Sequence, residues 1–183
     1  MPEVPDPVSR AAALERGQKV LAGAQDDHTG HWVLVTPWRL VVVDPAAFGE
    51  SARVVDRPWR DVDAGGWDPH TGTLTVSWVG QGAALAWRLW SRTGPGRVPE
   101  AFRERVQASV VLTRSVDLGS GRRVRVVIRK DLRTRELHEQ VLLGATTRGD
   151  DPALARAVAE VRRELRDQVG LPPELPSAGS ADS

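Results

Sequence analysis

The chain has 183 residues, with 25 basic and 24 acidic side chains and a formal net charge of +1. This length suggests one domain, or one domain with a small appended part. A net charge near zero gives little bulk attraction to nucleic acid or acidic lipid. The absence of cysteine excludes a disulfide framework and thiolate metal sites. Because no apolar run resembles a signal peptide or a spanning helix, we expect a cytoplasmic protein without a transmembrane segment.

The first part of the chain predicts a short helix within an N-terminal arm over residues 1–17. Asp6 is a candidate N-cap, Pro7 suits the first helical position, and Gly17 suits the exit from the helix.

Residues 18–91 show alternating or short apolar runs, which are typical of strands. Two segments, Asp26–Gly30 and Asp68–Gly72, have the composition of tight turns. The strands predicted around these turns are Lys19–Ala24, His31–Thr36, Trp38–Asp44, Ala52–Arg57, Thr73–Val79 and Ala83–Trp90.

A helical pattern follows, opened by Pro99 and Glu100 and predicted to run to about Arg114. Its apolar stripe contains Phe102, Val106 and Val110.

The last third of the chain predicts a hairpin and a second helix. The hairpin pairs a strand around residues 122–130 with Leu137–Leu143. The helix is expected over Pro152–Val169, with Asp151 as its cap and Gly170 at its end. The tail Leu171–Ser183 is rich in Pro, Ser, Ala and Gly, which predicts disorder.

Two short sequence segments resemble segments of a known superfold. They are Thr36-Pro37-Trp38-Arg39-Leu40 and Pro58-Trp59-Arg60-Asp61-Val62. With the strand meander and the following helix, they resemble the pleckstrin-homology-like (PH-like) superfold, in particular its GRAM-type and bacterial members. The whole chain is also similar to a family of uncharacterised proteins from GC-rich bacteria.

The resemblance implies an α+β fold in which residues 18–115 form an antiparallel β-barrel or sandwich capped by the helix that bears Phe102. Residues 116–170 would then be an appended hairpin and helix, and residues 171–183 a tail. Folds of this kind usually bind peptides, proteins or lipid head groups through loops or a sheet edge, and they rarely catalyse.

Catalytic and metal-binding patterns are sparse. Asp26, Asp27, His28 and His31 could supply ligands for a divalent metal, but the same residue types build a hairpin turn, which is the interpretation we favour. Nucleophile motifs are missing, so neither a cofactor nor an enzyme is predicted. An enzyme of unrecognised type would instead gather His28, His31 or Asp61 in a pocket.

Two surfaces remain as candidate binding sites. The Arg-rich strand could contact phosphates of nucleic acid or lipid, although a solvated outer face is the interpretation we favour, because the net charge is near zero. Its residues are Arg122, Arg123, Arg125, Arg129 and Lys130. Three tryptophans at strand or turn margins could contact a protein partner, and these are Trp38, Trp59 and Trp67. The favoured function is therefore a non-enzymatic module that binds a protein or a second copy of itself, with anion binding as the alternative.

Overall fold

A computed structural model describes residues 4–16, 18–80, 83–120, 122–144, 147 and 152–172. The chain divides into two compact units, which are described one at a time. Unit 1 contains residues 1–111 together with the hairpin tip Arg129–His138, and unit 2 contains residues 112–128 and 139–183. None of the helices in the described ranges is long and apolar enough to cross a membrane.

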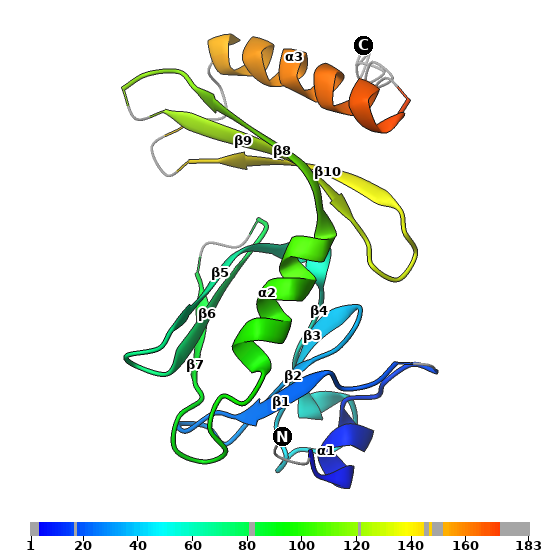
Figure 1. The fold of residues 1–183 in the computed structure, drawn as a ribbon, viewed down its shortest axis with the longest axis vertical. Coiled ribbons are helices and arrows are strands. Elements are labelled where there is room, and N and C mark those ends of the chain that lie inside the picture. Colours follow the sequence, from blue (N-terminus) through cyan, green and yellow to red (C-terminus); the bar gives the residue numbers. More distant parts are fainter. Residues whose placement is uncertain are drawn as a thin grey trace, which may run out of the picture. The chain divides into compact units, whose positions relative to one another are not determined.

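The first sheet of unit 1 is a four-stranded antiparallel meander in the order β1-β2-β3-β4 (Figure 1). Its strands are β1 (Ala22–Gln25), β2 (Trp32–Val35), β3 (Arg39–Val43) and β4 (Arg53–Pro58). The apolar residues of β2 and β3 are all buried, because both faces of this sheet are covered. One face, with Val33 and Val42, joins the main core, while Leu34 and Val41 pack in a second cluster with Val8 of α1 (Asp6–Ala11).

The second sheet of unit 1 has the order β5-β6-β7 and is also antiparallel. Its strands are β5 (Val62–Asp68), β6 (Thr73–Trp78) and β7 (Leu85–Arg88). Leu74, Val76 and Trp78 of β6 are buried, which confirms the predicted alternation of that strand. Strand β5 was not predicted, because its glycine pair weakens any strand pattern.

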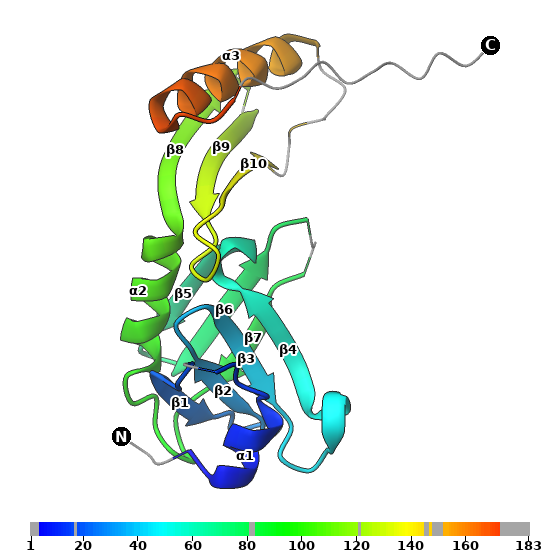
Figure 2. The ribbon, with the colours of Figure 1, turned by 90° about the vertical axis from the view of Figure 1, so that its right-hand side faces the viewer.

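Helix α2 (Val98–Ser109) packs against the core that the two sheets share (Figures 1 and 2). The ring of Phe102 contacts that of Trp59 edge to face, with centroids 5.7 Å apart. The predicted extension of this helix to Arg114 is wrong. Strand β8 (Val110–Asp117) begins directly after Ser109, because the β-branched run that starts at Val110 favours an extended backbone.

The short helices of unit 1 also differ from the predicted ones in their bounds and caps. Helix α1 ends at Ala11, and Pro5 is its N-cap, so Asp6 lies inside the first turn and does not cap the helix. Gly17 lies outside the described residues. Two 3₁₀ turns, η1 (Gly49–Ala52) and η2 (Trp59–Asp61), flank β4.

The remaining sheet has the order β10-β9-β8, with β9 spanning Arg123–Lys130 and β10 spanning Leu137–Leu143. Helix α3 (Pro152–Val169) belongs to unit 2 and has the predicted bounds. Gly170 ends it with a positive φ of 69°, and the Leu171 N–H donates to the Arg166 carbonyl, as in a helix C-cap. The predicted cap Asp151 and the tail from residue 173 onward lie outside the described residues.

The α+β class and the antiparallel sheets are thus confirmed, whereas no closed barrel is found among the described strands. In unit 1 the two sheets are joined at one corner by the turn after β1. There the Asp27 N–H donates to the Arg88 carbonyl at 2.7 Å, and the Arg88 N–H donates to the Asp26 carboxylate at 2.8 Å.

Candidate partner-binding groove

A groove of about 570 Å³ lies between β5 and α2 in unit 1. Among the described residues, those that line it come from these two elements. They are Gly65, Gly66, Trp67, Pro99, Glu100, Phe102, Arg103, Val106 and Gln107. We call this surface the β5–α2 groove.

Gly65 allows the helix and the strand to approach each other. A Cβ atom at this position would lie 2.4 Å from Cζ of Phe102 and 3.3 Å from the Thr75 carbonyl oxygen. Both distances are too short for an unshifted side chain, so any other residue here would push α2 away from β5. At Gly66 a Cβ atom would meet nothing within 4 Å.

The apolar wall of the groove is anchored in the core. Phe102 is buried, while Trp67 and Val106 are half-buried and pack on the main core. At the rim, Arg103 is exposed and Glu100 pairs with Arg97 at 3.2 Å. The groove therefore combines a fixed apolar wall with charges that reach water.

Strand β5 also offers an open backbone edge beside the groove. Among the described strands it pairs with β6 alone, in a register that joins Gly65 to Val76 and Trp67 to Leu74. Near the start of the strand, the Arg129 guanidinium donates to the Asp63 carbonyl at 3.3 Å. Beyond that point, the alternate N–H and C=O groups of an edge strand can pair with an added strand.

The three tryptophans predicted to contact a partner have different environments. Trp59 is fully buried, so the prediction that it contacts a partner is wrong, and its Nε1–H donates to the Thr36 carbonyl at 2.9 Å. Trp67 lines the β5–α2 groove. Trp38 is half-buried under the guanidinium of Arg133, whose Cζ lies 5.9 Å from the ring centroid.

The hydrogen bond from Trp59 to Thr36 connects the two sequence segments on which the PH-like resemblance is based. The Thr36 hydroxyl donates to the Arg39 carbonyl at 2.7 Å and accepts from the Arg39 N–H at 3.1 Å, which closes the tight turn between β2 and β3. It also accepts from the Gln18 amide at 2.7 Å. A threonine before Pro37 and an aromatic N–H donor after Pro58 therefore have structural roles in this chain.

The two carboxylates that follow β1 accept hydrogen bonds from backbone N–H groups. The Asp26 carboxylate accepts from the Thr29 N–H at 2.8 Å and from the Thr29 hydroxyl at 2.7 Å, which confirms the predicted turn. The Asp27 carboxylate accepts from three successive N–H groups, at Trp90, Ser91 and Arg92. Desolvation raises the pKa of Asp27, but these N–H groups together outweigh it and hold the pKa below its usual range.

The histidines considered for metal binding or catalysis have separate neighbours. His28 is exposed, and His31 lies 3.8 Å from Asp44. Asp61 pairs with Arg57 and Arg60. Within the described ranges, no group of three or more potential ligands could hold a metal ion.

The Arg-rich strand does not present a uniform outer face. Arg129 is 3 % exposed and donates to the Ser109 hydroxyl at 3.0 Å, so the expected outward position of Arg129 is wrong. Val127 on the same side of β9 is buried as well, which explains why a cation there must be satisfied internally. In unit 2, Arg123 is exposed and pairs with Asp117 at 3.2 Å.

The other three members of this set are less exposed than Arg123. Arg122 donates to the Leu118 carbonyl at 3.1 Å, and Arg125 and Lys130 are half-buried.

The hairpin tip belongs to unit 1 through a contact that the sequence did not predict. Arg60 of η2 forms an ion pair with Asp131, and its Nη1 lies 3.0 Å from Nε2 of His138. Desolvation raises the pKa of Asp131, but the Thr134 and Arg133 N–H groups and the Arg60 charge outweigh it, so the pKa is lowered. The carboxylate is therefore charged at neutral pH.

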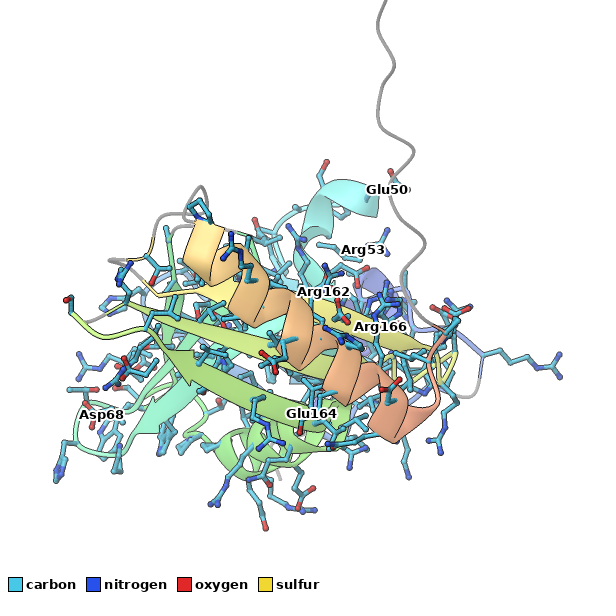
Figure 3. The ribbon with its side chains drawn as sticks, turned by 90° about the horizontal axis from the view of Figure 1, so that it is seen from above. Glu50, Arg53, Asp68, Arg162, Glu164 and Arg166 are labelled. Atoms are coloured by element: carbon cyan, nitrogen blue, oxygen red, sulfur yellow. The ribbon has the colours of Figure 1, made fainter. Side chains whose placement is uncertain are left out.

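Ion pairs connect helix α3 to the strands of unit 2. Figure 3 labels Arg162, Glu164 and Arg166 on this helix. The Glu139 carboxylate, 7 % exposed, binds both Arg162 and Arg166, the latter at 2.8 Å. Glu164 pairs with Arg114 of β8 at 2.8 Å.

Comparisons with protein-family models, curated proteins and solved structures give no match to this chain.

Proposed function

We propose that unit 1 is a PH-like interaction module, without catalytic function, that binds an extended segment of a protein partner in the β5–α2 groove. The observation that carries the proposal is the open edge of β5 beside an apolar wall made by Trp67, Phe102 and Val106. A segment added to a sheet edge gains main-chain hydrogen bonds, and its alternate side chains gain specificity from the adjoining pocket.

The order of elements supports the PH-like part of the proposal. Four antiparallel strands are followed by three more and then by a helix that packs on the core shared by both sheets. The hydrogen bond between Trp59 and Thr36 adds to this support, because it connects the two sequence segments on which the resemblance depends.

The charge distribution supports a protein partner over phosphate. Arg129 is buried, Arg123 is paired with Asp117, and Arg122 donates to the Leu118 carbonyl, so these cations of the alternative site already have partners within the chain. The groove has mainly apolar walls, with one exposed cation, Arg103, at its rim.

A peptide-display experiment tests this function. The full chain is immobilised and panned against a random-peptide library, and the enriched peptides are then measured by titration against Gln107→Trp and Gln107→Ala. Gln107 is exposed and lines the groove, so the large ring should cover the groove and reduce affinity at least tenfold, while alanine should bind as the parent does. Leu85→Ser, on the opposite edge strand of the same sheet, is the distant control.

The proposal predicts enriched peptides that carry apolar residues at alternate positions, as an added strand requires. Failure to enrich any peptide, or equal binding by Gln107→Trp and the parent, would exclude the groove as the binding site.

A further inference from the structure

Phe48 is the starting point for a second interaction surface, away from the β5–α2 groove. It precedes η1 with an extended backbone, and its side chain is 90 % exposed. A large aromatic group held in water is unfavourable, and such residues are enriched at the centres of protein interfaces.

A hollow of about 510 Å³ adjoins this side chain in unit 1. Its walls come from α1, from the loop after β3 and from η1, and they include Pro7, Ala11 and Ala47. A cavity of about 150 Å³ already holds a benzene molecule, so the hollow has room for a phenylalanine ring. Phe48 itself is one of the residues that line the hollow.

The same small surface carries both signs of charge. Arg10 of α1 and Glu50 of η1 both line the hollow, and Figure 3 labels Glu50 on the η1 turn. The Glu50 side chain is 97 % exposed, and its 4.0 Å contact with Arg53 is long because Arg53 is held by Asp56 at 3.1 Å. Glu50 therefore keeps acceptor capacity for a cation from another molecule.

A projecting ring, a hollow and opposite charges on one patch make the patch complementary to itself. In a two-fold dimer, if one residue contacts a second residue of the partner, the second contacts the first of the partner, so each contact away from the axis is made twice. We propose that this surface binds a second copy of the chain, with Phe48 of each copy in the hollow of the other and Glu50 of each beside Arg10 of the other.

Sedimentation equilibrium of the full chain over a wide concentration range tests the proposal. The parent chain should show a reversible monomer–dimer equilibrium. Phe48→Ser should weaken dimerisation at least tenfold, because the ring is lost from both halves of the interface. Leu85→Ser removes another exposed apolar side chain, 41 % exposed on β7, and should leave the equilibrium unchanged.

Charge exchange provides a test that does not depend on the apolar contact. Glu50→Arg alone and Arg10→Glu alone should each weaken the dimer, while the double exchange should restore it. Tryptophan fluorescence confirms folding of each variant, since all seven tryptophans lie in residues 32–90 of unit 1.

A parent chain that stays monomeric into the high micromolar range would overturn the proposal, as would a Phe48→Ser variant that dimerises as the parent does. Neither result bears on peptide binding in the β5–α2 groove, which the Gln107 variants test separately.

Discussion

Gly65→Ala should destabilise unit 1, because the added methyl group meets Phe102 on one side and backbone on the other. Its carbon would lie 2.4 and 2.5 Å from two ring atoms of Phe102 and 3.3 Å from the Thr75 carbonyl oxygen. The ring cannot simply withdraw, because it packs edge to face on the buried Trp59. Overpacking of this kind costs about 1–3 kcal/mol of unfolding free energy.

Urea unfolding followed by tryptophan fluorescence measures this cost in unit 1. With a slope of about 1–3 kcal/mol per molar urea, a loss of about 2 kcal/mol lowers the unfolding midpoint by about 1 M. The matched control is Gly66→Ala, where the methyl group meets nothing within 4 Å. We expect the control to stay within about 0.5 kcal/mol of the parent or to gain stability, since alanine restricts the unfolded chain.

A double variant identifies the contact that causes the loss. Phe102→Leu is itself destabilising because it removes ring packing. Combined with Gly65→Ala, however, it should cost less than the sum of the two single changes, by about 0.5–3 kcal/mol of coupling. If Gly65→Ala proves as harmless as Gly66→Ala, or if the two effects simply add, the account of how α2 approaches β5 is wrong.

Three further changes test contacts elsewhere in the chain. Asp27→Asn should reduce the acid sensitivity of unit 1. The lowered pKa of Asp27 gives stability that is present above the ordinary carboxyl pKa of 3.8 and is lost as pH falls through the folded-state pKa. Urea unfolding midpoints measured from pH 7 to pH 2 would record this loss. Glu139→Gln removes the carboxylate that Arg162 and Arg166 share, which should cost unit 2 about 1–3 kcal/mol and speed hydrogen exchange of the α3 amides. Trp59→Phe should cost about 1–3 kcal/mol in urea unfolding, because a buried carbonyl loses its donor.

Each of these changes has a control within the same experiment. Asp68→Asn removes another carboxylate whose pKa is lowered, chiefly by the His70 N–H, but one that lies within a single exposed turn. A pH profile altered equally by both Asn variants would contradict a special role for Asp27. For Glu139→Gln, tryptophan fluorescence should stay unchanged at low urea, and unchanged exchange in α3 would refute the expected loss. Parent-like stability of Trp59→Phe would show that its N–H contributes little.

Local patterns predicted most of the strands and the last helix. The alternation of β6 and the apolar stripe of α3 are explicit in the residues themselves, so Thr73–Trp78 and Pro152–Val169 could be placed closely. Strand β5 could not, because Gly65 in its centre lies against Phe102, a residue distant in the sequence. The end of α2 was misplaced because the four-residue spacing of Val106 and Val110 fits a helix as well as it fits a helix followed by a strand.

The β5–α2 groove could be predicted only in part, because it too depends on contacts between residues that are distant in the sequence. Trp67 was considered as a partner contact from its place at a turn margin, but the wall formed by Phe102 and Val106 depends on how α2 meets β5. Trp59 was grouped with Trp67 on the same criterion and proved to be core. Its indole N–H donates to the carbonyl of Thr36, far from it in the chain.

The hairpin tip shows how one long-range pair decides the role of an otherwise ordinary turn. Asp131 accepts from the Arg133 and Thr134 N–H groups at 2.8 and 3.0 Å, which alone would make a solvated turn. Its carboxylate also pairs with Arg60 of η2, and Arg129, two residues earlier on β9, donates to the Asp63 carbonyl of β5. Nη1 of Arg60 also lies 3.0 Å from Nε2 of His138, so the guanidinium has two neighbours in the hairpin tip. The basic residues of this segment therefore act first as donors within unit 1, and this is why their excess in the sequence is weak evidence for an anion site.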